Sequence, residues 1–418
     1  MVVLHPSLPL AAAAGLALPV AMFAPKALAA LFALTVVAAL AMHVFTHRAP
    51  PPIPARLGAA LAAVLVLAAG SSLWSLTPDR TLWAAIPLAG LMLGIAVLLG
   101  IAHRFDDAAR ARIGTALLFG VAVGAGVLLI ERTFDRALLR AGLSLLGWDR
   151  ITAPYTLKPG ATILALALWP CLPVLARRFS PAATAAAVAV LFAAILFSGS
   201  DAAALSAALG LGVFALARRW DRIMAPLLGT ALAGLMIAAP WIPSLAPDPR
   251  VSMAGLERLS NSGIHRIIIW QTAAEHIRAR PWLGHGFDTS RSLYPQETSS
   301  MIVLARPSSA KMAAFKAELI PLHPHNMALQ IWLEMGAVGA MAVLAALLTV
   351  LVGLARAGLS RNERAVGYGF FVAALAIAAT AYGAWQAWWL SALGLNAVFL
   401  VALFSYSRKT GQDVRDHG

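Results

Sequence analysis

The sequence predicts an all-α protein that crosses a membrane repeatedly, with about 12 transmembrane helices and one large, partly helical loop between the ninth and the tenth. Of its 418 residues, 60% are hydrophobic and only 12% are charged. Soluble domains carry about 25% charged residues, and the mean hydropathy here is +0.79. These values exclude a soluble globular enzyme, a disordered chain and a secreted scaffold held together by disulfide bonds.

The predicted spans are the stretches of about 20 mostly apolar residues that a bilayer core about 30 Å thick requires. Their Ala-, Leu- and Gly-rich composition suits close helix packing in lipid. Within a few residues, the spans run over 8–24, 27–45, 57–76, 81–102, 113–131, 160–176, 182–198, 201–217, 223–242, 325–354, 366–384 and 386–405.

These spans divide the chain into four parts. Residues 1–242 form nine transmembrane helices, 243–324 form the large loop, 325–405 form three more helices, and 406–418 form a cytoplasmic tail. The first span lacks a basic leader and a small-residue cleavage site, so we predict a retained helix rather than a signal peptide.

The basic residues predict the orientation, because Lys and Arg concentrate in short cytoplasmic loops. Of the 32 Lys and Arg residues, 16 follow even-numbered spans, whereas the short segments after spans one, three, seven and eleven hold only Lys26 and Arg80. Both termini are therefore predicted to be cytoplasmic and the large loop to be outside. The remaining 14 lie in two outside segments, 132–159 and 243–324, where the topology does not require them.

The net charge of +14 and the pI near 11.1 raise the question of nucleic acid. A nucleic-acid binder gathers its basic residues on a soluble face, and here they lie in loops between membrane spans, so we predict no nucleic-acid partner. The single cysteine, Cys171, can form no intramolecular disulfide and leaves no cysteine-based metal site. We predict neither a metal nor a cofactor.

Within the large loop, residues 261–280 predict a helix with an apolar stripe, ended by Pro281. This helix lies either on the membrane surface or on the protein. Arg266 falls in its first turn, where the helix dipole disfavours a cation, and an anion bound beside it would explain its presence. The Gly-rich turn that follows, with Gly284 and Gly286, is by itself weak support for a binding site.

The loop ends directly before span ten with the sequence Leu322-His323-Pro324-His325-Asn326. Because proline starts helices well, His325 is predicted in the first turn of a membrane helix. A histidine there can act as base, acid or ligand, or it can be an interfacial residue without a function. Glu334, about half a rotation further round the helix, is not expected to contact His325. An acid at that depth needs a partner, whether its role is an inter-helix hydrogen bond or catalysis.

Other notable residues have structural interpretations. Gly336 and Gly339 are predicted to let helices approach each other. Asp201 follows the turn Ser198-Gly199-Ser200 and can cap the next helix. An aromatic belt at the outer interface is predicted for Trp385, Trp388 and Trp389.

Taken together, the motifs resemble the signature of the O-antigen ligase and O-antigen polymerase superfamily. About twelve helices with one large periplasmic loop between spans nine and ten are also similar to that family. The specific motifs occupy about 266–339 and are Arg266-x-x-x-Trp270, Pro281-x-x-Gly284-x-Gly286, and His325-Asn326 followed after nine residues by Gly336-x-x-Gly339.

The resemblance implies a glycosyltransferase of the bacterial inner membrane that works at the periplasmic face. The donor would be a glycan on undecaprenyl diphosphate, and the acceptor a hydroxyl group of lipid A–core oligosaccharide or another glycan. His325 would be the base of a metal-independent, inverting reaction, and Arg266 would hold the diphosphate. Supporting positions would be His323, Asn326, Trp270, Glu334, Gly336 and Gly339.

One residue departs from the family pattern. Members often carry an arginine directly after a Ser-x-Ser at the outer end of a mid-chain helix, where this chain has Asp201. An acid cannot replace a cation on a diphosphate, so another basic residue is needed. Our first choice is Lys158, and the other candidates are Arg136, Arg140 and Arg150.

Three alternatives remain at the sequence level. A polymerase of the same superfamily would share the donor but would need a site for a second lipid-linked glycan, and a related enzyme would glycosylate proteins. A transporter without chemistry would bury ionisable residues near the middle of the membrane. The clustering of polar groups at one face of this chain favours an enzyme at the membrane surface.

Overall fold

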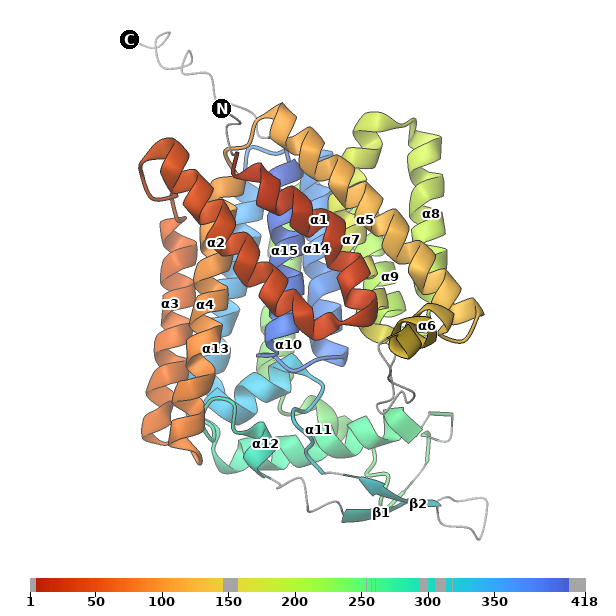
Figure 1. The fold of residues 1–418 in the computed structure, drawn as a ribbon. Helices are drawn as coiled ribbons and strands as arrows, with labels where there is room; N and C mark the ends of the chain where they lie inside the picture. The colour runs from red at the N-terminus through yellow and green to blue at the C-terminus, as the bar shows by residue number, and fades with distance from the viewer. Residues whose placement is uncertain are drawn as a thin grey trace.

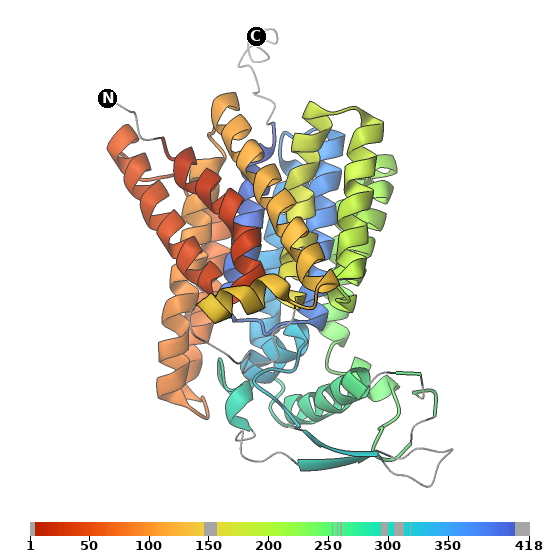
Figure 2. The same ribbon diagram turned by 45° about the vertical axis from the view of Figure 1, so that its right-hand side comes forward.

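The computed structural model describes residues 5–145, 157–252, 254–256, 258–259, 261–293, 300–304, 313–317 and 319–405. Long helices run side by side as a bundle, and the large loop forms a separate layer at one end of it (Figure 1). The start of α1 and the end of α15 lie at the opposite end (Figures 1 and 2). The fold is that of an all-α polytopic membrane protein.

Each predicted span corresponds to one helix. Among the described residues, nine helical stretches are long and apolar enough to cross a membrane, while α1, α8 and α15, with 17 residues each, are shorter. The number of twelve crossings therefore stays a prediction. The helices are α1 (Ser7–Phe23), α2 (Leu28–His47), α3 (Ala55–Gly70), α4 (Pro78–Ala102), α5 (Asp107–Thr133), α7 (Lys158–Arg178), α8 (Pro181–Phe197), α9 (Asp201–Arg219), α10 (Asp221–Ala238), α13 (Met327–Arg356), α14 (Arg361–Thr380) and α15 (Ala387–Leu403).

Shorter elements complete the chain. The sequence did not predict the antiparallel strand pair β1 and β2, in which Ser300 pairs with Ala317 and Leu304 with Ala313. The layer at the end of the bundle contains α11, α12 and these strands (Figure 2). The bounds are η1 (Pro25–Ala27), η2 (Ser71–Leu73), α6 (Ala137–Leu145), η3 (Ile242–Leu245), α11 (Asn261–Ala279), α12 (Ser290–Leu293), β1 (Ser300–Leu304) and β2 (Ala313–Ala317).

Polar caps determine where several helices begin. A side-chain oxygen before the first turn accepts a hydrogen bond from a backbone N–H group that has no partner inside the helix. Asp106 caps α5 in this way, Ser180 caps α8, and Ser360 and Glu363 form a capping box on α14. These caps fix the helix starts at the bundle end opposite the large loop.

Small residues bring helices close together, as the composition predicts. A Cβ atom on Gly120 of α5 would overlap the backbone of α1 at Gly15. Gly210 of α9 and Gly369 of α14 both lie against the fully buried ring of Trp169 in α7. The core of the bundle therefore depends on glycines that no larger residue can replace without movement.

Candidate active site

The Gly-rich turn 281–286 is joined to a break in α13. At Gly336 the backbone takes φ 62° and ψ −161°, so the helical hydrogen-bond ladder is interrupted. On one side of the break, Ala337 and Val338 donate backbone N–H bonds to the carbonyl oxygens of Pro281 and Trp282 (2.8 and 3.2 Å). Non-helical backbone at membrane depth is tolerated where protein groups satisfy it, and the turn does this here.

The same turn also provides hydrogen-bond donors for the backbone carbonyl groups on the N-terminal side of the break. The N–H groups of His285 and Gly286 donate to the carbonyl oxygens of Leu333 and Glu334 (3.0 and 2.8 Å). Side chains at Gly284 and Gly336 would overlap the facing backbone, and both residues have positive φ. Our prediction that Gly336 lets two helices approach was therefore wrong: it breaks a helix so that a loop can dock there.

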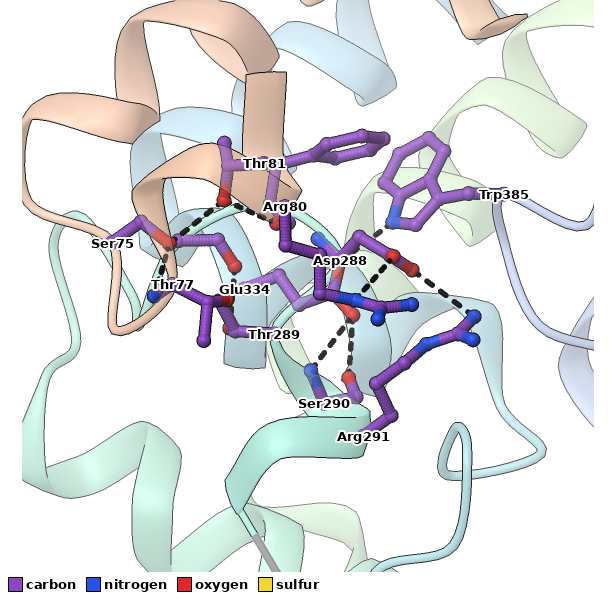
Figure 3. A network of polar contacts seen from close by, with 12 residues as sticks. Ser75, Thr77, Arg80, Thr81, Asp288, Thr289, Ser290, Arg291, Glu334 and Trp385 are labelled. Carbon is purple, nitrogen blue, oxygen red and sulfur yellow. Dashed lines mark hydrogen bonds and ion pairs between the residues drawn. The ribbon is translucent and has the colours of Figure 1, made fainter. Parts of the chain in front are cut away.

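The turn is also attached to the start of α4. The backbone N–H of Phe287 donates to Ser71 Oγ (2.9 Å), and Thr81 Oγ1 donates to the Phe287 carbonyl oxygen (2.8 Å). Thr81 in turn bonds to Ser75, as Figure 3 shows. Two distant parts of the membrane bundle, α4 and α13, thus hold the residues after Gly286 in place.

Glu334 is the central acceptor of this region and is fully buried, with 0% exposure. Its carboxylate accepts bonds from the backbone N–H of Asp288 (2.8 Å), the hydroxyl of Ser290 (2.5 Å) and the indole of Trp385 (2.7 Å), as Figure 3 shows. Gln330 Nε2, one turn earlier in α13, donates a further bond (3.0 Å). The acid that the sequence placed at costly depth is thus fully partnered.

Asp288 brings two cations to the site that the sequence analysis did not select. Its side chain is only 12% exposed, and it pairs with Arg80 at 3.1 Å and with Arg291 at 3.3 Å (Figure 3). Arg80 counted only as a lone charge in a short outer segment. A signal was present in Asp288 itself, because a carboxylate two residues after a docking Gly-x-Gly turn needs a cationic partner once it is buried.

The segment between α14 and α15 links Glu334 to the histidines. Trp385 bonds to Glu334, and the backbone N–H of Ala384 donates to Gln330 Oε1 (2.8 Å). Our prediction of a lipid-facing aromatic belt was wrong here, because Trp389 is fully buried and Trp385 is a hydrogen-bond donor to a buried acid. These tryptophans face protein groups since the segment folds over the start of α13.

His325 lies one residue before the N-cap of α13. Asn326 occupies the cap, and its side chain accepts a bond from the Leu329 N–H (3.1 Å). The prediction that His325 lies within the first helical turn was therefore wrong, because asparagine is a preferred capping residue and the helix begins after it. His325 itself has φ 53°, in the left-handed region.

The imidazole of His325 is held in a defined orientation. Its Nδ1 lies 2.8 Å from the Ala381 carbonyl oxygen, which can only accept, so Nδ1 carries the proton. The neutral ring then has a lone pair on Nε2, for which no hydrogen-bond partner occurs among the described residues. His323 supports this arrangement, because its Nδ1 accepts the backbone N–H of His325 (3.2 Å).

Electrostatics keep both histidines neutral near pH 7. Burial lowers the pKa of His325 below its ordinary value of 6.5; the bond to Ala381 opposes this shift, and the charges of Arg266 and His265 add to it. Burial, with contributions from His325 and Arg291, lowers the pKa of His323 to about 3. His325 is thus the better base of the two.

The helix α11, which contains Arg266, is hydrogen-bonded to the segment directly before His325. Trp270, one turn after Arg266, donates its indole N–H to the Pro324 carbonyl oxygen (2.9 Å), directly before His325. The buried residues Ile268 and Ile277 show that this helix lies on the protein. The helix begins at Asn261, so Arg266 lies in its second turn. Our prediction that Arg266 lies in the first turn was therefore wrong.

The other predicted cations differ in position. Lys158 is exposed at the start of α7, one turn before Thr162, whose hydroxyl bonds to Tyr382 in the segment that holds His325 (3.1 Å). Arg140 pairs with Asp135, and Arg136 precedes α6, at the bundle end that faces the large loop (Figure 1). Arg150 lies outside the described residues.

The turn before α9 places an acid where the family pattern has a cation. Ser200 occupies the N-cap, and Asp201 lies exposed in the first turn, where the helix dipole favours a negative charge. A cation does lie close by: Arg132, at the end of α5, donates to the Phe197 carbonyl oxygen (3.2 Å) and packs over the Phe197 ring. The sequence analysis did not select Arg132.

Comparison with known proteins finds similar sequences over the region that contains this site. Residues 186–344, which include α11, the 281–286 turn and the break in α13, match the family model described as O-antigen ligase. A Rickettsia bellii protein named "Putative polysaccharide ligase" is 28% identical over 68% of this chain and 65% of its own length. Proteins of the same description from Rickettsia conorii and Rickettsia felis are 25% and 27% identical, each over 70% of this chain and 67% and 68% of their own lengths. The chain spans about two thirds of the length of these relatives, and its residues 186–344 are similar to the O-antigen ligase family.

Proposed function

We propose that this protein is a glycosyltransferase that moves a glycan from undecaprenyl diphosphate to a hydroxyl group of lipid A–core oligosaccharide. It would work in the bacterial inner membrane, with the large loop in the periplasm. Similarity to the O-antigen ligase family supports a membrane enzyme of the glycosyltransferase type. The observation that carries the finer proposal is the His325 ring, oriented by the Ala381 carbonyl and near enough to Arg266 for that charge to lower its pKa.

In the proposed reaction, His325 Nε2 removes the proton from the acceptor hydroxyl. The geometry supports this role, because Nδ1 is committed to the Ala381 carbonyl and Nε2 is the ring atom with a lone pair. A lowered pKa keeps the ring unprotonated near pH 7, and general base catalysis of this kind contributes about 10²–10⁴-fold in rate.

The acceptor oxygen then attacks the anomeric carbon as the bond from that carbon to the diphosphate oxygen breaks. Attack from the face opposite the diphosphate inverts the anomeric centre. The leaving diphosphate gains negative charge, which Arg266 stabilises with paired N–H donors. A lysine at this position would keep the charge but lose the fork of donors.

A second cation is proposed at Lys158. Its helix start is tied through Thr162 and Tyr382 to the segment that orients His325, and among the described residues its ammonium group has no ion-pair partner. Two cations on the diphosphate would let the reaction proceed without a metal. Arg136, Arg140 and Arg150 are the weaker candidates, since Arg140 already pairs with Asp135.

Glu334 is proposed to act through position and not through contact with substrate. Its carboxylate joins the residues after the Gly-rich turn to Trp385, and Gln330 joins the same helix to Ala384. Three residues before Ala384, the Ala381 carbonyl orients His325. The acid therefore supports the base by anchoring the segment 381–386, which carries the Ala381 carbonyl.

The proposal is tested by complementation of a strain that lacks the gene. With His325→Ala, we expect loss of long-chain lipopolysaccharide on a gel and accumulation of long polymer on the lipid carrier. His325→Gln guards against a folding defect, and His103→Ala, exposed at the other end of the bundle, should restore normal ladders. Normal ladders from His325→Ala would contradict the mechanism, and accumulation of single repeat units would identify a polymerase instead.

A further inference from the structure

A polar pocket of about 230 Å³ lies between α11 and the turn that follows α10. Six of its eight lining residues contribute polar groups: a hydroxyl, an amide, two carboxylates and two guanidinium groups. The residues that contribute these groups are Ser244, Asp248, Arg250, Gln271, Glu275 and Arg278. None of them belongs to the site around His325.

The turn that forms one wall of the pocket is hydrogen-bonded to α11. Gln271 Nε2 lies 3.3 and 3.0 Å from the carbonyl oxygens of Pro243 and Ala246, which fastens the turn to α11. Asp248 forms one wall of the pocket. Its carboxylate accepts paired bonds from the Arg250 guanidinium and a further bond from the Arg250 backbone N–H. Together these bonds fix the distance between the turn and the helix.

The pocket faces away from the reaction centre. At 100° per residue, Gln271, Glu275 and Arg278 lie about 120–180° round α11 from Arg266. Glu275 also lies about 14 Å further along the helix axis. A ligand that contacts both Arg266 and this pocket must therefore be longer than one sugar and must pass around the helix.

The lining chemistry selects a neutral, hydroxyl-rich ligand. Two carboxylates balance two guanidinium groups, which gives no net charge to attract a phosphate or a cation. A hydroxyl group both donates and accepts, so neighbouring hydroxyls of a sugar fit a carboxylate beside a guanidinium. Within the described part of the chain, neither Glu275 nor Arg278 has a hydrogen bond or an ion pair, and both are exposed.

We propose that this pocket binds one sugar unit of the glycan substrate, at a distance from the bond that is formed. Its volume lies below the roughly 300–1,000 Å³ of sites that enclose drug-sized ligands, so it holds a single unit of a longer chain. The inference rests on the proposed function in one respect: the ligand is taken to be a glycan of the transfer reaction, from either the donor or the acceptor.

The test measures glycan binding directly, on the full chain in lipid nanodiscs. Two probes come from the deletion strain: core oligosaccharide, and polysaccharide released from the lipid carrier by mild acid. Saturation-transfer NMR gives their affinities for the wild type and for Glu275→Gln combined with Arg278→Gln. Arg280→Gln is the matched control, because Arg280 is also exposed at the end of α11 but does not line the pocket.

We expect one of the probes to bind the wild type, and the double variant to bind it at least tenfold more weakly, with Arg280→Gln unchanged. The probe that binds identifies the source, and in transfer assays KM for that substrate should rise while kcat holds. Absence of binding by both probes, or equal binding by the double variant, overturns the inference. His325→Ala should bind the glycan probe as the wild type does. If the proposed function is wrong, the transfer assay shows it, and if the proposed pocket is wrong, the binding assay shows it.

Discussion

At the scale of single residues, His325 has an unusual backbone conformation and a fixed ring orientation. Its backbone is left-handed, which few residues other than glycine adopt without strain, and its Nδ1 proton is fixed on the Ala381 carbonyl. Residues in sparsely populated conformations often cluster at functional sites. The motif singled out His325, but it could not predict the contact with Ala381, because that partner lies 56 residues further along the chain.

The pKa of His325 predicts the pH dependence of transfer. The folded-state pKa is below 6.5, so the neutral base persists as pH falls through 6.5 and is lost only at lower pH. The profile of kcat/KM against pH should rise with pH on its acid limb, with a midpoint below 6.5. Initial rates of the purified protein between pH 5 and 8, a range that brackets the ordinary histidine value, measure this. A midpoint above 6.5 would count against His325 as the base.

At the scale of elements, the break in α13 is the feature that periodicity could not predict. Residues 325–354 form one apolar stretch, and the pattern gives no sign that the ladder is interrupted at Gly336. The glycines of 281–286 and 336–339 appeared as two separate motifs. The structure shows that the first motif docks on the second, which explains in physical terms why both contain glycine.

A substitution at the break tests its importance. Gly336→Ala places a Cβ against the backbone of Trp282 and Leu283 at a φ of 62°, so we expect destabilisation by more than about 1 kcal/mol. Gly353→Ala is the matched control, since it lies in the same helix with open space and should be neutral or stabilising by about 0.5–1 kcal/mol. Thermal unfolding in detergent compares them. Equal unfolding temperatures for the two variants would contradict this account of the break.

The other features could be predicted from the sequence only where they depend on residues that are close together in the chain. The twelve predicted spans match twelve helices, because the length of an apolar stretch can be counted directly along the sequence. Trp385 was predicted to belong to an aromatic belt, because the sequence does not show its bond to Glu334, which lies 51 residues earlier in the chain. Arg80 and Arg291 were missed for the same reason: Asp288 gathers them from separate elements.

At the scale of the whole molecule, the structure shows where helices of the two cation-rich outside segments lie. Half of the basic residues follow even-numbered spans, and the sequence assigned 14 of the other 16 to two outside segments. In the structure α6 and α11, which belong to those segments, lie at the same end of the bundle (Figures 1 and 2). An end rich in cations suits a lipid-linked diphosphate.

The predicted orientation is open to a labelling test in intact cells. The native cysteine, Cys171, is fully buried, so it leaves a low background. Trp282→Cys introduces a thiol at a site with 73% exposure in the large loop, which a membrane-impermeant maleimide should label. His103→Cys, exposed at the far end of α4, should react only after the cells are broken. The reverse pattern would place the large loop in the cytoplasm.

The central claim, that His325 is the base of a glycan transfer, is tested most directly with purified protein in liposomes. The rate of transfer from undecaprenyl-diphosphate-linked glycan to lipid A–core is measured at saturating substrate for the wild type and for His325→Ala. The account predicts a fall of about 10²–10⁴-fold in a variant that unfolds like the wild type. A correctly folded His325→Ala protein that transfers glycan at the wild-type rate would contradict it.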